Sequence, residues 1–327
     1  MPTLRVDPRS PDPEAVRRAA ATLRRGGLVA FPTETVYGLG ASALDPAAVA
    51  RIFAAKGRPS YNPLIVHVAD ADAARALAAE WNPAAERLAE RFWPGPLTLV
   101  VPRRAEVPDA VTAGLPSVAL RVPAHSVAHA LLREVGIPVA APSANRSTGV
   151  SPTTAAHVER SLGERVDLIL DGGPTPVGIE STVVSLAGGV PTLLRPGTVS
   201  VEELRDAVGE VALPSSGPEG TAARPSPGML DRHYAPRAEV RLFDGPGAAP
   251  AGPEGGRTAV LAIRAAAPPA GEIVRMPADA REYAARLYAT LHRLDDEGFD
   301  RILVELPPDT PEWAGVRDRL RRAAHPG

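Results

Sequence analysis

The sequence predicts an α/β fold, in which helices flank a twisted, mostly covered mixed sheet and a smaller α/β domain follows. Three observations support this prediction. Helical and strand-like segments alternate through the first two hundred of the 327 residues, and several strand-like segments are continuously apolar. Residues 213–237 are then rich in Gly, Pro and Ser without hydrophobic periodicity, which is typical of a linker. Helix and strand patterns resume after it.

Capping signals define the first elements. Asp12-Pro13 opens a helix that Gly26-Gly27 ends, and an apolar strand follows at 28–31. Asp45-Pro46 opens a second helix, which ends at Gly57. Further strands are predicted at 64–68, 97–101, 118–122, 139–141, 166–170 and 181–186. Further helices are predicted near 83–92, 125–135, 153–162 and 200–208. Beyond the linker we expect strands at 240–243, 258–263 and 301–306, and helices at 278–294 and 311–323.

Composition excludes several classes of protein. The 36 basic and 38 acidic residues give a net charge of −2, so the whole chain does not present a field for nucleic acid or anionic membranes. The absence of cysteine excludes disulfide partners, thiol nucleophiles and cysteine-ligated metals. No apolar run approaches membrane-spanning length, and the start lacks a signal-peptide pattern. We therefore expect a soluble cytoplasmic protein with no membrane partner.

The common nucleotide-binding motifs are absent or weak. No GxxxxGK[ST] phosphate loop occurs. Residues 38–43 match the loose G-x-G-x-x-A dinucleotide pattern, but the following helix starts separately at Asp45-Pro46. No acidic residue lies at the expected distance of about 20 residues, since Asp70 comes too late. We therefore disfavour a dinucleotide site.

Two polar segments lie beside predicted strands. Residues 32–40 place hydroxyls, a carboxylate and a phenol after a buried strand, where they either bind a small polar ligand or form an ordinary turn. Lys56 and Arg58 either hold a carboxylate or polyphosphate together or cap a helix C-terminus. Lys56 is unusual because it is the only lysine among the 36 basic residues. His67 lies within a strand, where a core histidine is the commoner interpretation.

Two further segments carry polar groups among small or apolar residues. Residues 138–152 supply Ser143, Asn145 and Ser151 as hydrogen-bonding groups, or as the caps of an ordinary loop. In the second, the Gly178–Val184 segment is followed by an arginine at 195. Arg121 lies in an apolar strand, where a charge needs either a structural partner or a ligand.

Together these segments resemble the YrdC-type threonylcarbamoyl-adenylate synthase family in its long, two-domain form. The motifs that carry the resemblance are FPTETVYGLG, KGRPSYNPLIVHV, FWPGPLTLV, ALRVP, APSANRSTG, GIESTVV, LLRPG and SPGMLDRHYAP. The resemblance implies a YrdC-like catalytic domain at 1–212 and a linker at 213–237 that folds over the active site. It also implies a small C-terminal α/β domain, Rossmann-like, at 238–327.

The resemblance also implies a reaction. L-Threonine, bicarbonate or CO₂, and ATP, accompanied by Mg²⁺, would give L-threonylcarbamoyl-AMP and pyrophosphate. Such an enzyme is a nucleotidyltransferase, and a separate tRNA threonylcarbamoyl transferase complex would receive the product. We expect Mg²⁺ to bind through phosphates and water, because no dedicated metal site is visible in the sequence.

Site residues follow from the matching positions. The catalytic set implied by the resemblance is Lys56, Arg58 and Asn145. The threonine-binding set is Thr35, His67, Arg121, Ala141 and Ser181. The ATP-binding set is Arg58, Asn62, Ser117, Ser143, Ser151, Arg195 and Tyr234. The family often has threonine at positions 117 and 141, so Ala141 can keep only a backbone contact.

Two alternatives stay open. Carbamoyl-adenylate synthesis in hydrogenase maturation uses this domain together with cysteine-rich zinc modules, and this chain has no cysteine. An RNA-binding module of the same fold would need basic patches with aromatic residues among them. Aromatic residues make up only 4% of the chain, and its charges nearly balance.

Overall fold

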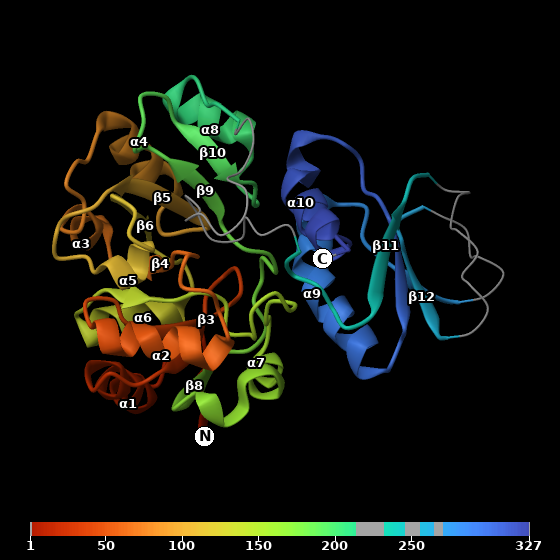
Figure 1. Cartoon of the computed structure of the whole chain (residues 1–327), viewed down its shortest axis with the longest axis horizontal. Coiled ribbons are helices and arrows are strands. Elements are labelled where there is room, and N and C mark those ends of the chain that lie inside the picture. Colours follow the sequence, from red (N-terminus) through yellow and green to blue (C-terminus); the bar gives the residue numbers. More distant parts are fainter. Residues whose placement is uncertain (1, 214–231, 246–255, 265–270, 327) are drawn as a thin grey trace.

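Two sheets organise the chain, one of ten strands and one of four, and they lie in separate lobes (Figure 1). The computed structural model describes all residues except 1, 214–231, 246–255, 265–270 and 327. Most of the predicted linker therefore lies outside the described residues. None of the described helices is both long and apolar enough to cross a membrane.

The first lobe contains eighteen strands and helices in mixed order. Its strands are β1 (Thr3–Arg5), β2 (Val29–Pro32), β3 (Tyr37–Ser42), β4 (Ile65–His67), β5 (Leu97–Pro102), β6 (Ser117–Arg121), β7 (Val139–Ala140), β8 (Leu168–Asp171), β9 (Thr182–Ser185) and β10 (Thr192–Arg195). Its helices are α1 (Pro13–Arg24), α2 (Pro46–Lys56), α3 (Ala71–Arg75), α4 (Pro83–Phe92), α5 (Asp109–Thr112), α6 (Ser126–Val135), α7 (Ala155–Leu162) and α8 (Val201–Val208). A short 3₁₀ turn follows α7 at Gly163–Arg165.

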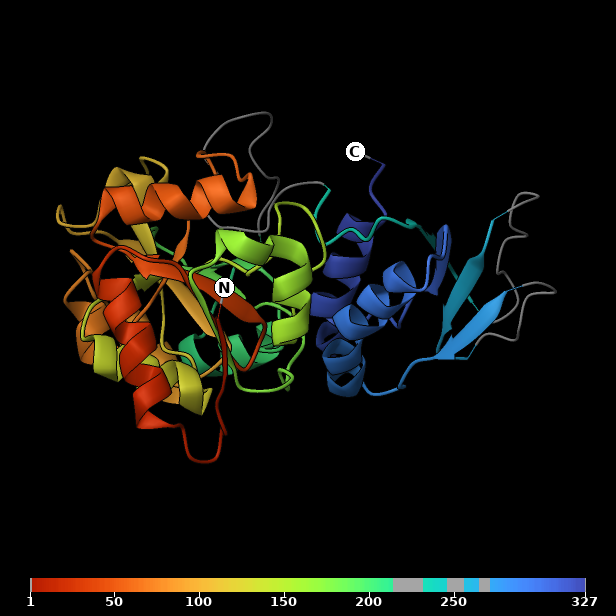
Figure 2. The ribbon, with the colours of Figure 1, turned by 90° about the horizontal axis from the view of Figure 1, so that it is seen from below.

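The large sheet is mixed and covered on both faces, which confirms the predicted fold class. Its strand order is β1-β8-β2-β3-β7-β4-β6-β5-β9-β10, with parallel and antiparallel neighbours. Alternate residues of β2 serve opposite cores: Ala30 faces the core under α2, and Val29 and Phe31 face the core under α1 and α6. Helices α1 and α2 accordingly lie on opposite sides of the sheet (Figure 2).

Most predicted elements are present, and the differences have local causes. The glycine-rich segment that loosely matched a dinucleotide loop is strand β3, which pairs with β2 and β7. Its glycines therefore lie in a sheet and not at a helix N-terminus. Strand β3 itself was therefore not predicted. Strands β1, β10 and β13 and helices α3 and α5 were not predicted either, because each is too short to show a hydrophobic period.

The second lobe is a small, all-parallel sheet with its helices on one side. Its elements are β11 (Glu239–Phe243), β12 (Thr258–Ala262), β13 (Glu272–Arg275), α9 (Ala280–Asp296), β14 (Arg301–Glu305), a 3₁₀ turn (Pro311–Trp313) and α10 (Ala314–Ala323). The strand order is β11-β14-β12-β13. Helices α9 and α10 lie between this sheet and the first lobe (Figures 1 and 2). Their core includes Val36, Val150 and Ile179 from the first lobe, so the two lobes share apolar packing.

Two glycines allow the lobes to touch backbone to backbone. A Cβ added to Gly178, which has a φ of +80°, would lie 2.4 Å from the carbonyl oxygen of Ala284 on α9. A Cβ on Gly315 of α10 would lie 2.6 Å from the carbonyl oxygen of Gly197. Side chains at either position would force α9 or α10 away from the first lobe.

A stacked histidine pair closes another part of the same interface. The rings of His157 on α7 and His292 on α9 are 3.9 Å apart, and Arg160 forms a 3.1 Å ion pair with Asp296 beside them. His292 also contacts the backbone carbonyl of Ser151 through Nε2, at 3.1 Å. Burial, together with the neighbouring His292 and Arg160, lowers the pKa of His157 from 6.5 to about 3.

This low pKa predicts acid-sensitive stability. The unfolded chain takes up a proton at His157 near pH 6.5, whereas the folded chain does so only near pH 3, so stability is lost as the pH falls between these values. Urea unfolding from pH 6 to 4 should show wild type losing up to about 1.4 kcal/mol more per pH unit than His157→Gln. Equal slopes in the two proteins would contradict this prediction.

Candidate functional site

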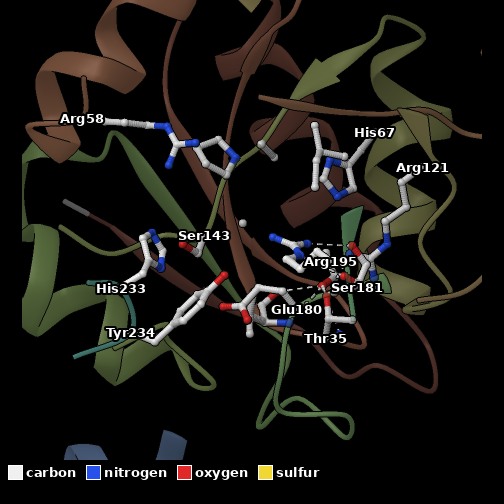
Figure 3. Close-up of a pocket in the computed structure, with 16 residues that line it drawn as sticks. Thr35, Arg58, His67, Arg121, Ser143, Glu180, Ser181, Arg195, His233 and Tyr234 are labelled. Carbon is white, nitrogen blue, oxygen red and sulfur yellow. Dashed lines mark hydrogen bonds between the residues drawn. The ribbon is translucent and has the colours of Figure 1, made fainter. Parts of the chain in front are cut away.

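A buried pocket opens where the central strands of the first lobe meet residues 233–234 (Figure 3). The residues that line it are Thr33, Thr35, Val36, Gly38, Arg58, Ile65, His67, Arg121, Ala141, Pro142, Ser143, Glu180, Ser181, Arg195, His233 and Tyr234. Nine residues of the predicted sets are among them: Thr35, Arg58, His67, Arg121, Ala141, Ser143, Ser181, Arg195 and Tyr234. The pocket thus brings together groups that are up to 201 positions apart in sequence.

One end of the pocket is built by the parallel strands β4 and β6. Their register places His67 directly opposite Arg121, at the last position of each strand. Arg121 is buried and donates to Glu34 at 2.6 Å, to Thr35 Oγ1 at 2.9 Å and to the carbonyl of Gly95 at 3.2 Å. Glu34 is therefore the structural partner that a charge in an apolar strand requires.

His67 is held in its neutral form at this end. Burial, together with the positive charge of Arg121, lowers its pKa from 6.5 to about 3. Its Nδ1 atom is buried and has no hydrogen-bond partner among the described residues. A neutral imidazole with an unused nitrogen beside a guanidinium suits a ligand that carries both a carboxylate and a hydrogen-bonding group.

Two more guanidinium groups line the pocket: Arg58 on the side away from Arg121, and Arg195 between them, beside Ser181 (Figure 3). Arg58 donates to the carbonyls of Asn62 (3.3 Å) and Pro63 (3.0 Å), which fixes its fork in place. Burial lowers the pKa of Arg58 to about 10, so it is still a cation at neutral pH. Arg195 donates to the carbonyl and the hydroxyl of Ser181, both at 3.1 Å. Two planar, immobilised guanidinium groups are well suited to phosphate or carboxylate oxygens.

Lys56 lies behind the pocket wall and is not among the lining residues. Its ammonium donates to the carbonyl of Ser143 at 2.6 Å and to the carbonyl of Asn145, while its own carbonyl accepts from the Ser147 amide at 2.9 Å. Burial, followed by the charge of Arg58, holds the pKa of Lys56 well below its usual range. In this structure Lys56 therefore shapes the 143–147 loop. Its predicted place beside the reacting phosphate stays a prediction.

The remaining predicted residues lie around the pocket and do not line it. Asn145 donates to the carbonyls of Arg146 and Gly149 within the same loop. Ser117 lies at the opposite end of β6 from Arg121, paired with Pro102. The hydroxyl of Ser151 donates to Glu180 at 2.5 Å. Asn62 is fully buried next to the Arg58 fork.

Tyr234, which lines the pocket, has an unusual backbone conformation. Its φ of +60° is left-handed, which is costly for an aromatic residue and is maintained only where the surroundings enforce it. Ala235 donates to the carbonyl of Thr148 at 3.0 Å, and the Tyr234 ring stacks on Tyr288 of α9 at 5.9 Å. These contacts hold the phenol against the pocket.

Several polar atoms around the pocket are buried without a partner among the described residues. They are both side-chain polar atoms of Asn62, Nδ1 of His67, Oδ1 of Asn145, Nδ1 of His233 and the hydroxyl of Tyr234. Each unsatisfied buried group costs about 1–3 kcal/mol, so such a concentration is typical of a ligand site rather than a packed core.

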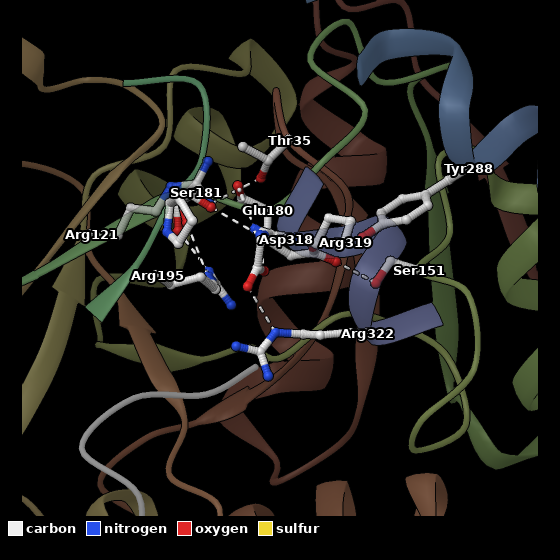
Figure 4. Close-up of polar contacts among 11 residues, drawn as sticks. Thr35, Arg121, Ser151, Glu180, Ser181, Arg195, Tyr288, Asp318, Arg319 and Arg322 are labelled. Atoms are coloured by element: carbon white, nitrogen blue, oxygen red, sulfur yellow. Dashed lines mark hydrogen bonds and ion pairs between the residues drawn. The ribbon is translucent and has the colours of Figure 1, made fainter. Parts of the chain in front are cut away.

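Glu180 links the pocket to the second lobe (Figure 4). Its carboxylate accepts from Ser151, from the hydroxyl of Tyr288 at 2.9 Å and from Arg319 of α10 at 2.7 Å. Burial alone would raise the pKa of Glu180, but the charges of Arg319 and Arg195 outweigh this effect and hold it at about 2. Glu180 is therefore ionised, and both of its carboxylate oxygens accept hydrogen bonds.

Sequence reasoning missed part of this site. Thr33, Glu34, Glu180 and His233 lie within the motifs that carry the family resemblance, but the resemblance gave them no role. Arg319 and Tyr288 gave no signal, because an arginine and a tyrosine on amphipathic helices are ordinary. The described residues contain no group of three or more His, Cys, Asp or Glu that could hold a metal ion.

The fold and the pocket define a two-domain α/β protein whose buried, arginine-rich cavity suits small anionic ligands. A family model for Sua5, YciO and YrdC proteins, described as Telomere recombination, matches residues 21–197. A second, described as Threonylcarbamoyl-AMP synthase, C-terminal domain, matches residues 199–325. The chain belongs to this Sua5/YciO/YrdC family, in its long two-domain form, as the sequence resemblance predicted.

Individual relatives match over nearly their full length. Threonylcarbamoyl-AMP synthase of Pyrococcus abyssi (strain GE5 / Orsay) is 44% identical over 320 residues, covering 94% of each chain. Threonylcarbamoyl-AMP synthase of Bacillus subtilis (strain 168) is 42% identical, covering 96% of this chain and 93% of its own. The crystal structure of P. abyssi Sua5 complexed with L-threonine superposes with a TM-score of 0.91 at 41% identity, covering 99% of this chain and 98% of that one.

Proposed function

We propose that this chain synthesises L-threonylcarbamoyl-AMP from L-threonine, bicarbonate or CO₂, and ATP, with release of pyrophosphate. The observation that carries this proposal is a single buried pocket with Arg121 and neutral His67 on one side, Arg58 on the opposite side and Arg195 between them, beside Ser181 (Figure 3). Such a pocket suits an amino acid and a nucleotide side by side. The names of the full-length relatives support the same reaction.

The Arg121 end would take L-threonine. Arg121 uses three donor atoms on Glu34, Thr35 and Gly95, but each terminal nitrogen carries a second N–H that can reach the substrate carboxylate. Neutral His67 and the hydroxyls of Thr35 and Ser181 offer hydrogen bonds to the rest of the amino acid. Ala141 can contribute only its backbone.

The other end would take ATP as its magnesium complex. Arg58, Arg195 and Ser143 would hold the phosphates, and Asn62 and Tyr234 would add hydrogen bonds from their unpartnered atoms. We propose that Ser117 and Ser151 also belong to the ATP-binding residues, as the family resemblance implies. The described residues supply no carboxylate cluster, so Mg²⁺ would arrive on the phosphates and keep most of its water.

The proposed chemistry depends on positioning and charge neutralisation. The threonine amine combines with CO₂ to form a carbamate and lose a proton. A carbamate oxygen then attacks the α-phosphorus of ATP, and the bond between this phosphorus and the bridging oxygen to the β-phosphate breaks. Arg58 and Arg195 offset the charge on the departing pyrophosphate. Lys56 and Asn145 hold the 143–147 loop against the reacting groups.

This reaction makes the chain a nucleotidyltransferase whose product is a reactive mixed anhydride. Its use therefore requires an acceptor enzyme, for which we propose a cytoplasmic tRNA threonylcarbamoyl transferase complex. The competing hypothesis of an RNA-binding module would require salt-dependent RNA binding without threonine-dependent turnover of ATP.

Pyrophosphate release from ATP and bicarbonate tests this proposal. Release should depend on L-threonine, because the carbamate is the nucleophile. L-Threonylcarbamoyl-AMP should form in an amount equal to that of the pyrophosphate released. Release that is the same with and without L-threonine would contradict the proposal.

Variants at the two ends of the pocket should affect different substrates. Arg121→Ala should raise the KM for L-threonine by about tenfold or more while changing the KM for ATP by less than about threefold, because a charged hydrogen bond is lost only at one end. Arg58→Ala should have the reverse effect. Initial rates measured against each substrate would check this, and the opposite ranking would overturn the division of the pocket.

A further inference from the structure

A buried arginine of the second lobe contacts residues that line the pocket. Arg319 of α10 has a side chain with no exposed surface, and its Nε donates to Glu180 at 2.7 Å. A second of its nitrogens donates to the carbonyl of Pro196 (2.9 Å) and to Asp318, and the third donates to the carbonyl of Glu180 (3.3 Å). Arg319 therefore binds the backbone next to two residues that line the pocket: Glu180 precedes Ser181, and Pro196 follows Arg195.

Arg319 also contacts Tyr234, which lines the pocket. Its guanidinium carbon lies 5.1 Å from the centre of the Tyr234 ring, in a cation–π contact. The same ring stacks on Tyr288, whose hydroxyl donates to Glu180. One arginine thus contacts both Glu180 and Tyr234, which face the pocket from different segments.

The contacts of Arg319 also matter for the electrostatics of the pocket, because they pair the negative charge of Glu180. Among the described residues that line the pocket, Glu180 is the only carboxylate, and it lies at the end where Arg195 provides positive charge. A buried carboxylate without a counter-charge would repel a polyphosphate and would divert Arg195 from it. With Arg319 on one of its oxygens and Ser151 on the other, Glu180 is neutralised from the side away from the pocket.

We propose that Arg319 is a positioning residue through which the second lobe prepares the nucleotide end of the pocket, by neutralising and orienting Glu180. This inference rests on the proposed function for its ligand, a magnesium nucleoside triphosphate. It gives the second lobe a task in substrate binding: without Arg319, Glu180 would turn toward Arg195 and Arg58, and these cations would no longer be available for phosphate.

The test asks whether removing the Glu180 charge rescues the loss of Arg319, and it is read out by binding. Calorimetric titrations of the full chain with magnesium ATP, and separately with L-threonine, would compare wild type, Arg319→Met, and Glu180→Gln combined with Arg319→Met. Arg319→Met should weaken ATP binding by about tenfold or more while changing L-threonine binding by less than about twofold. The double variant should recover ATP binding to within about threefold of wild type, because the unpaired carboxylate is gone.

Arg160→Met is the matched control. It breaks a different ion pair between the lobes, that of Arg160 with Asp296, which is half-exposed at 48% and 44%, and it should leave both affinities unchanged. Equal weakening of ATP and L-threonine binding in Arg319→Met, without recovery in the double variant, would reduce Arg319 to a structural role and overturn the inference. If Arg319→Met does not fold, the inference is tested with the variant that combines Glu180→Gln and Arg319→Met. A folded double variant that binds ATP supports the inference, and one that is unfolded or does not bind ATP refutes it.

Failure of the proposed function would be visible separately. Wild type that binds neither magnesium ATP nor L-threonine would refute that function before any variant is compared.

Discussion

The ion pair between Glu180 and Arg319 is the interaction on which the rest of the site depends. Both groups are buried, and buried charges are stable only when each is paired and its remaining hydrogen-bonding positions are filled. The structure meets this requirement with groups from both lobes: Ser151 and the Pro196 carbonyl from the first, Tyr288 and Asp318 from the second. The close backbone contacts at Gly178 and Gly315 make this geometry possible, because they bring α9 and α10 within reach of the pocket.

The same rule explains how the pocket holds three guanidinium groups without collapsing. Arg121 is anchored by Glu34 at the end of a central strand, while Arg58 and Arg195 are anchored by backbone carbonyls and Ser181. Each anchor removes rotational freedom before a ligand arrives, so less entropy is lost on binding. Lys56 does the same for the 143–147 loop by joining two of its carbonyls. The charged side chains are therefore arranged in advance for small anions, and the unpartnered atoms of Asn62, His67 and Tyr234 add specific hydrogen bonds.

Local sequence signals predicted most helices and strands, whereas strand β3 and the partners of the buried charges depend on tertiary contacts. Asn, Asp or Ser caps and terminal glycines located most helices correctly, such as Pro13–Arg24 and Pro46–Lys56, because these signals act over a single turn. Strand β3 escaped prediction because its glycines suggested a loop, whereas they fit close to Phe31 and Val139 in the sheet. Motif resemblance found nine of the lining residues. It could not find the partner of Arg121, 87 positions away at Glu34, or that of Glu180, 139 positions away at Arg319. In a chain with 35 arginines among its 36 basic residues, only the folded arrangement distinguishes these pairs.

A crystal structure of the full chain with L-threonine and a non-hydrolysable magnesium ATP analogue would locate both substrates in the pocket. We expect the threonine carboxylate on Arg121, the phosphates on Arg58 and Arg195, and Glu180 still paired with Arg319. Phosphates bound away from Arg58 and Arg195, or a Glu180 carboxylate that leaves Arg319 to coordinate the magnesium ion, would contradict this expectation.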